Sequence, residues 1–152
     1  MQTVKIEPFN IIGISIRTTN ENGQANKEIA ELWEEFMSGN ILTKIPNKVN
    51  NEIYSLYTDY ESDYTKPYTA ILGCKVENLE SVPRGMVGKS FEGGTYLKTT
   101  AKGDLMKGLV VNQWLKIFEM ELERTYDADF EIFGGKAQNP SDAEVDFYIG
   151  VK

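Results

Sequence analysis

Apolar and polar residues alternate along six stretches of the chain, and a longer period of three to four residues replaces this alternation in two others. Alternation places successive side chains on opposite faces of a strand, whereas the longer period gives a helix one apolar stripe. The predicted strands are 4–18, with a break at Pro8, then 53–60, 67–77, 89–100, 129–134 and 143–151. The predicted helices are 25–38 and 104–123. The resulting order is strand, helix, strand, strand, and then the same again.

Details of these elements predict where backbones and side chains are buried. Gly13 lies inside the first strand, which indicates either a bulge or a close approach of two backbones. The first helix carries its apolar residues on one stripe, and they are Ile29, Leu32, Trp33 and Phe36. The second helix has a wider apolar stripe, so we expect it to be buried more deeply than the first.

The two halves of the chain agree in register as well as in order. One constant shift carries Trp33 onto Trp114 and Phe36 onto Ile117. We therefore interpret the chain as one α+β domain, residues 1–152, made of two βαββ repeats at about 1–79 and 86–152. Each repeat is too small to be stable alone, so we expect the two repeats to pack together. The expected fold has antiparallel sheets and two helices related by a pseudo-two-fold axis. A small-molecule pocket is expected at the centre, where the repeats meet.

Composition narrows the classes of function. The chain has 23 acidic and 16 basic residues, a formal charge of −7, which argues against nucleic acid or an anionic membrane as a partner. It contains no His, and Cys74 is its single cysteine, so His-based catalytic triads, His-ligated zinc and an intrachain disulfide are excluded. We expect no metal, no cofactor and no catalytic residues. Without a signal peptide or a long apolar run, the expected location is cytoplasmic.

Glu131 lies within the short aromatic and aliphatic run 130–133. Strands are poor in Glu, and alternation places Glu131 and Phe133 on one face, with Phe130 and Ile132 on the other. Either this face meets water, and Phe133 is the unusual residue, or it lines a cavity, and Glu131 is. The residues alone leave both interpretations open.

The C-terminal segments 129–134 and 142–151 resemble the ending of GyrI-like domains, which are also called bacterial effector-binding domains of AraC type. Gly94-Thr95-Tyr96 and Trp114 are also similar to that family, and the resemblance covers essentially the whole chain. It implies a fold of two βαββ repeats around a central pocket. In multidrug-sensing transcription activators, such pockets bind bulky aromatic and often cationic compounds around an acid that matches Glu131.

The chain departs from those regulators in two respects. We expect no attached DNA-binding domain, and therefore a stand-alone effector-binding protein related to transcription regulators. Positions that are aromatic in the multidrug regulator align with Ala30, Lys107 and Ala143, so we expect a different ligand.

The expected ligand-binding residues combine this resemblance with the strand and helix faces. Trp33 and Trp114 are expected either to form two walls around a flat ligand or to belong to the core. Among the tyrosines of its hairpin, Tyr57 is expected to face inward. On the last strand, Tyr148 rather than Phe147 is expected to face the pocket. The complete expected set is Glu131, Trp33, Trp114, Phe133, Tyr96, Tyr57 and Tyr148.

Three functions remain in competition. The favoured one is a small-molecule-binding protein that captures bulky aromatic compounds, cationic or amphipathic, since nothing in the sequence assembles a nucleophile, a base and an oxyanion site. The second is a hydrolase of strained electrophiles, such as the cyclopropane-bearing toxins cleaved by some GyrI-like members, with Glu131 as general base. The third is a protein-binding inhibitor of gyrase type. An enzyme is not favoured, and a protein partner stays open.

Overall fold

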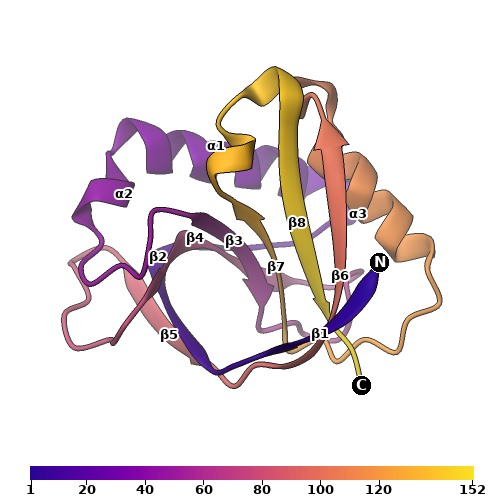
Figure 1. Ribbon diagram of the computed structural model, residues 1–152, viewed down its shortest axis with the longest axis horizontal. Coiled ribbons are helices and arrows are strands. Elements are labelled where there is room, and N and C mark those ends of the chain that lie inside the picture. Colours follow the sequence, from indigo (N-terminus) through magenta and orange to yellow (C-terminus); the bar gives the residue numbers. More distant parts are fainter.

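The computed structural model describes residues 1–152 and shows an α+β fold with one eight-stranded antiparallel sheet (Figure 1). The strands are β1 (Gln2–Ile6), β2 (Phe9–Thr18), β3 (Ile53–Thr58), β4 (Tyr68–Val76), β5 (Val87–Phe91), β6 (Gly94–Gly103), β7 (Ala128–Phe133) and β8 (Ala143–Gly150). The helices are α1 (Gln24–Ser38), α2 (Ile41–Lys44) and α3 (Leu109–Glu119). None of them combines the length and the apolar character needed to cross a membrane.

The order of the strands in the sheet is symmetric. It runs β1-β6-β8-β7-β3-β4-β2-β5, and exchanging each strand of one half with its counterpart in the other half only reverses this order. The axis that relates the halves passes between β3 and β7, which are paired with each other. Because α1 follows β2 and α3 follows β6, the helices obey the same symmetry. The predicted architecture of duplicated βαββ units is therefore confirmed.

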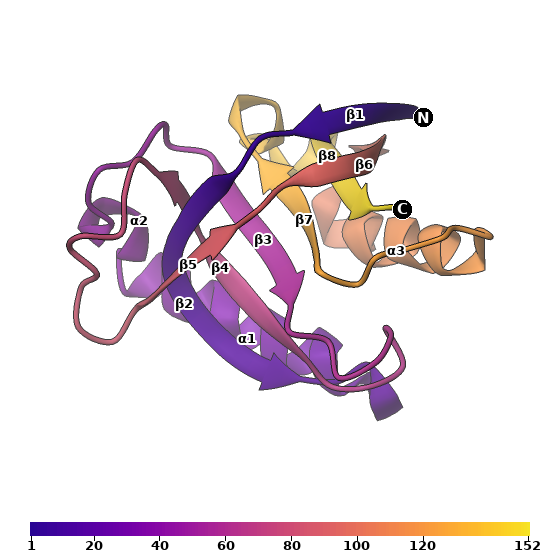
Figure 2. The ribbon, with the colours of Figure 1, turned by 90° about the horizontal axis from the view of Figure 1, so that it is seen from below.

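Two of the predicted strands bend in the middle, and their bends meet. Residues 4–18 divide into β1 and β2 near Pro8, and residues 89–100 divide into β5 and β6 near Gly93. β1 pairs with β6 and β2 pairs with β5 in one continuous register that runs through both bends. The sheet therefore curls until its two edges join (Figure 2).

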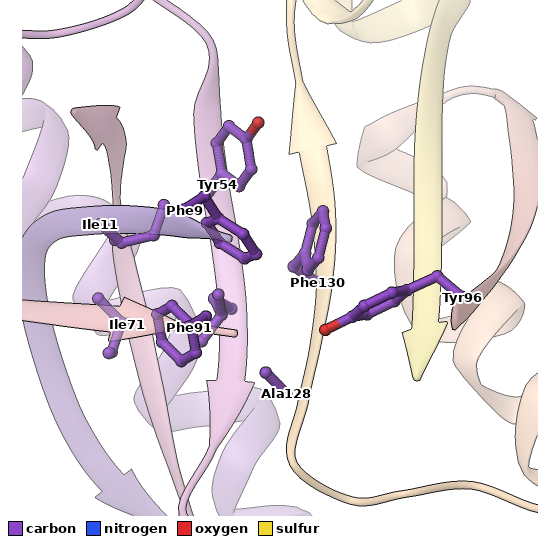
Figure 3. Packing of buried hydrophobic residues seen from close by; sticks show 9 residues of the cluster. Phe9, Ile11, Tyr54, Ile71, Phe91, Tyr96, Ala128 and Phe130 are labelled. Atoms are coloured by element: carbon purple, nitrogen blue, oxygen red, sulfur yellow. The ribbon is translucent and has the colours of Figure 1, made fainter. Parts of the chain in front are cut away.

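The space inside this curl is filled by aromatic and aliphatic side chains (Figure 3). Phe9 stacks on Phe91 with ring centroids 5.2 Å apart, and Tyr54 stacks on Phe130 at 5.5 Å. Ile132 packs against the same cluster. The predicted division of β7 is thus confirmed, because Phe130 and Ile132 face the interior of the curl and leave Glu131 and Phe133 for the other face.

The outer face of the sheet carries α1, which buries Leu32 and Phe36 against β2 and β4. Cys74 belongs to this cluster and is fully buried, as expected of a small hydrophobic residue. Gly13 pairs with Gly73 without a break in register, and a Cβ on Gly13 would lie 2.2 Å from the carbonyl oxygen of Leu72. Gly13 therefore allows a close approach of two backbones, and no bulge forms.

The second helix is shorter and more exposed than its sequence predicts. α3 starts only after Gly108, whose φ of 76° interrupts the helical path, and it ends at Glu119. Ile117 is its single buried residue, while Val111 and Leu115 are 41% and 54% exposed. The expectation of deep burial is wrong because most of this apolar stripe lines a cavity that is open to solvent instead of a packed core.

Candidate functional site

A cavity of ≈ 1450 Å³ lies between the outer face of the sheet and the helices α1 and α3. It is larger than the usual range of about 300–1,000 Å³ for ligand pockets. Of its 33 lining residues, 20 are hydrophobic, which is the composition expected of a site for an organic molecule. The cavity between the repeats is therefore mainly apolar, and its polar interactions with a ligand depend on a few side chains.

Glu131 is the most deeply buried of these polar side chains, with 1% of its surface exposed. It projects from the middle of β7, directly opposite Ser55 of β3. The Tyr57 hydroxyl donates to Oε1 at 2.7 Å, and Nε1 of Trp114 donates to Oε2 at 2.9 Å. The Tyr57 hydroxyl also lies 2.9 Å from Oγ of Ser55. Each carboxyl oxygen therefore has one neutral donor.

The charge of Glu131 has no counter-charge in the protein. None of the five ion pairs includes it. Burial raises the pKa of Glu131 to about 8, and the hydrogen bonds from Tyr57 and Trp114 oppose this rise only in part. Burial and the neighbouring carboxyl raise the pKa of Tyr57 well above its ordinary value, so its hydroxyl stays a donor.

Aromatic rings surround this carboxyl. Trp114 lies perpendicular to the Tyr57 ring, with centroids 5.5 Å apart, and it also contacts Phe118 at 6.0 Å. Tyr64, from the loop between β3 and β4, stacks on Phe118 at 4.2 Å and so links this loop to α3. On α1, Trp33 meets Phe133 edge-on at 4.8 Å. The aromatic side chains that line the cavity are therefore positioned by packing against other aromatic side chains.

A second buried carboxyl lies two residues earlier on the same face of β7. Asp129 is 0% exposed, and Arg124 donates from Nη2 to its Oδ2 at 2.7 Å. The Tyr60 hydroxyl donates to the same oxygen at 2.6 Å, and the Gly150 backbone N–H donates to Oδ1 at 2.8 Å. Asp129 is thus neutralised and fully hydrogen-bonded, in contrast to Glu131.

Five of the seven residues expected to bind a ligand line the cavity, and they are Glu131, Trp33, Trp114, Phe133 and Tyr57. Tyr96 and Tyr148 do not line it. Tyr96 packs on Phe130 inside the curl at a centroid distance of 5.4 Å (Figure 3), and Tyr148 stacks on the same ring at 4.8 Å. The prediction that Tyr148 rather than Phe147 faces the pocket is wrong. In the register of β7 and β8, Phe147 pairs with Glu131, so Tyr148 lies on the opposite face.

Several lining residues were not singled out from the sequence. They include Ile29, Met37, Tyr60, Tyr64, Tyr68, Val110, Val111, Leu115, Phe118 and Arg124. Those on α1 and α3 belong to apolar stripes that sequence alone assigns equally well to a core. Arg124 and Tyr64 lie outside the helices and strands, where periodicity carries no signal. Of the three aligned positions that differ from the multidrug regulator, Ala30 lines the cavity, whereas Lys107 and Ala143 do not.

The site offers no arrangement of ligands for a metal ion, because no three His, Cys, Asp or Glu side chains gather in a suitable cluster. Its chemistry is that of a large aromatic cavity with one buried acid, Glu131, that has no counter-charge. Such a cavity can enclose an organic molecule and attract positive charge.

Comparison with known proteins finds the same fold in solved structures. The Cass2 integron cassette protein of Vibrio cholerae is 27% identical and matches with a TM-score of 0.75, over 99% of this chain and 95% of that one. The structure of SAV2435 bound to tetraphenylphosphonium matches with a TM-score of 0.76, over 99% of this chain and 93% of that one. At 14% identity, this second match concerns the fold alone.

A relative in Bacillus subtilis (strain 168), YobU, is named as a candidate transcriptional regulator protein. It is 24% identical over 144 residues, which are 92% of this chain and 90% of YobU. The model of the Cass2 family, described as integron-associated effector binding protein, matches residues 2–151. The expected resemblance to GyrI-like domains is confirmed, because Cass2 is a GyrI-like family. This chain therefore belongs to the Cass2 family of integron-associated effector binding proteins.

Proposed function

We propose that this protein captures bulky aromatic compounds, cationic or amphipathic, in the cavity between the sheet and its two helices. One observation carries the proposal: Glu131 is a buried lining residue of an aromatic cavity and has no cationic partner in the protein. A carboxylate held out of water without a counter-charge costs several kcal/mol. A bound organic cation would supply the missing charge, and the rings would supply dispersion and cation–π contacts.

The raised pKa of Glu131 makes this binding depend on pH. Below about 8, the free protein holds Glu131 mainly in its protonated, neutral form. A permanent cation favours the ionised form, so its binding must release a proton in this range. Affinity for a cation should therefore rise as the pH increases toward about 8 and become constant above it.

The comparisons support the proposal at the level of the family. The family is described as effector-binding, and the solved structure of SAV2435 contains tetraphenylphosphonium, a bulky aromatic cation. The name of YobU supports a role in transcription regulation for the bound state. With an acidic chain of net charge −7, we propose that this role passes through a protein partner and not through direct contact with DNA.

Titration calorimetry with tetraphenylphosphonium and the neutral triphenylphosphine oxide tests the electrostatic part. At a pH above 8, Glu131→Gln should weaken binding of the cation at least about tenfold and leave binding of the neutral compound nearly unchanged. Wild-type affinity for the cation should fall by up to about tenfold per pH unit below 8. The matched control is Glu34→Gln, an equal change of charge on the exposed surface of α1. Equal cation affinity of Glu131→Gln and wild type at every pH would contradict the proposal.

One observation favours a hydrolase as the second candidate. A pKa near neutral is what a general base requires, and Glu131 has it. Incubation with a cyclopropane-bearing electrophile, followed by mass spectrometry, separates the two functions. Recovery of the intact compound supports binding, and a water adduct that Glu131→Gln does not form supports hydrolysis.

A further inference from the structure

Arg124 lines the cavity beside the Asp129 end of β7, and much of its hydrogen-bonding capacity is unused. Its side chain is 5% exposed, and Nη2 donates to Asp129. Nε and Nη1 are shielded from solvent and have no hydrogen-bond partner. A guanidinium group carries five N–H donors, so a single ion pair leaves most of them unpaired.

Buried donors without acceptors are rare, and each one lowers stability. The surroundings of Arg124 do not supply an acceptor. The rings of Tyr126 and Tyr64 lie over the guanidinium carbon, at 4.3 and 6.0 Å, and stabilise its charge through their faces. The Tyr60 hydroxyl is directed to Asp129. The remaining N–H groups are therefore available to a molecule that enters the cavity.

A ligand that displaces one ring would come to lie against the guanidinium group. Tyr64 belongs to the loop between β3 and β4 and is only half-buried. It also lines the cavity and stacks on Phe118 of α3. A flat ligand that takes the place of the Tyr64 ring would keep the stacking on Phe118 and lie against Arg124.

Charge selects the kind of acceptor. Asp129 already neutralises Arg124, and Glu131 lies two residues further along the same face, roughly 7 Å away along the strand. An anionic group bound here would lie close to two carboxyl groups. A neutral carbonyl oxygen accepts the same hydrogen bonds without this repulsion.

We propose that the natural ligand is an aromatic cation that also carries a carbonyl oxygen, with its positive centre at Glu131 and its carbonyl at the free N–H groups of Arg124. This inference rests on the proposed function and makes its ligand class narrower. The two polar contacts would fix the orientation of a molecule that the rings alone would hold loosely.

The test compares pentyltriphenylphosphonium with the same cation bearing a ketone in its pentyl chain. The ketone should bind wild type roughly tenfold more tightly, as expected for hydrogen bonds from a charged donor. In Arg124→Lys, which keeps a positive charge for Asp129, the affinity ratio of the two probes should fall to about one. Arg84→Lys, the same change outside the cavity lining, should keep the wild-type ratio.

A second measurement uses only the wild-type chain. Its arginines are Arg17, Arg84 and Arg124, so the Nε–H signals in a nitrogen–proton NMR spectrum are few and assignable. Both probes should shift the Arg124 signal by displacing the Tyr64 ring, and the ketone probe should move it further downfield because a hydrogen bond forms. This result does not depend on the folding of any variant.

The outcomes separate this inference from the proposed function. If neither cation binds, both fall together. If both bind with equal affinity and shift the Arg124 signal equally, the carbonyl subsite is overturned while cation capture stands. A probe with a carboxylate in place of the ketone overturns the preference for a neutral acceptor if it binds more tightly than the ketone.

Discussion

Asp129 and Glu131 are both buried on the same face of β7, yet their surroundings give them opposite roles. Asp129 receives three donors, one of them the cationic Arg124, and so stabilises the turn that leads into β7. Glu131 receives only neutral donors, from Tyr57 and Trp114. One acid is therefore satisfied within the protein, and the other keeps a charge deficit that a ligand can remove.

The state of Glu131 predicts how stability changes with pH. Its pKa in the folded protein is about 8, above the ordinary value of 4.5. The folded state therefore holds this proton more tightly than the unfolded state, so the contribution of Glu131 to stability is fully present below 4.5 and is lost as the pH rises through 8. Glu131→Gln should remove this decline. At pH 9 we expect the ligand-free variant to be more stable than wild type by a few kcal/mol, on the order of 1–4.

Urea unfolding at pH 5 and pH 9 checks this expectation. The two proteins should have similar unfolding free energies at the lower pH and differ at the higher one. A wild-type protein that is no less stable than Glu131→Gln at pH 9 would show that the carboxylate is compensated in the folded state.

Among the secondary-structure elements, helix α3 carries an apolar stripe that is mostly not buried in a core. Ile117 points into the sheet, but Val111 and Leu115 line the open cavity and stay exposed. Periodicity in sequence reports only that residues share a face, and a ligand-facing side and a core-facing side look alike. The same ambiguity applies to Trp33 on α1, which lines the cavity while packing on Phe133.

This exposure predicts that α3 tolerates charge better than its sequence indicates. Leu115→Lys should change the unfolding free energy by only about 0.5 kcal/mol, because no buried contact is lost. It should still weaken binding of tetraphenylphosphonium several-fold, since it replaces apolar lining with a like charge. Asn112→Lys, the same added charge on an exposed residue outside the lining, is the control. Loss of folding in Leu115→Lys, measured by circular dichroism, would mean that this stripe is core after all.

In the whole molecule, the two repeats are joined in two places. One is the pairing of β3 with β7 at the centre of the sheet, and the other is the crossing, where β1 pairs with β6 and β2 pairs with β5 through the two bends. The crossing depends on Gly93, which has φ of 78° and whose Cβ, if present, would lie 2.1 Å from the Ile6 carbonyl oxygen. The closed curl keeps β3 and β7 in place, and with them Tyr57 and Glu131 of the cavity.

Gly93→Ala should therefore destabilise the protein more than a positive φ alone explains. Gly85→Ala is the matched control, because Gly85 has φ of 85° and a Cβ added there would meet no atom within 4 Å. The control should lose about 1–2 kcal/mol through backbone strain, and Gly93→Ala should lose a further 1–3 kcal/mol through the clash with Ile6. Equal losses in thermal unfolding would show that the crossing adjusts without cost.

The order of strands and helices, the duplication and the two faces of β7 follow from the amino-acid sequence, because each of these depends on local periodicity or on similarity between segments. Its alternation placed Glu131 and Phe133 together, and a family resemblance made a pocket the preferred interpretation. Which tyrosines enter the cavity depends on how the strands pair, since the pairing of β8 with β7 turns Tyr148 away. The folded chain also brings Arg124 to Asp129 and leaves one side of α3 exposed to the cavity. Arg124 lies outside the helices and strands, and periodicity does not distinguish a side chain that faces a cavity from one that faces a core.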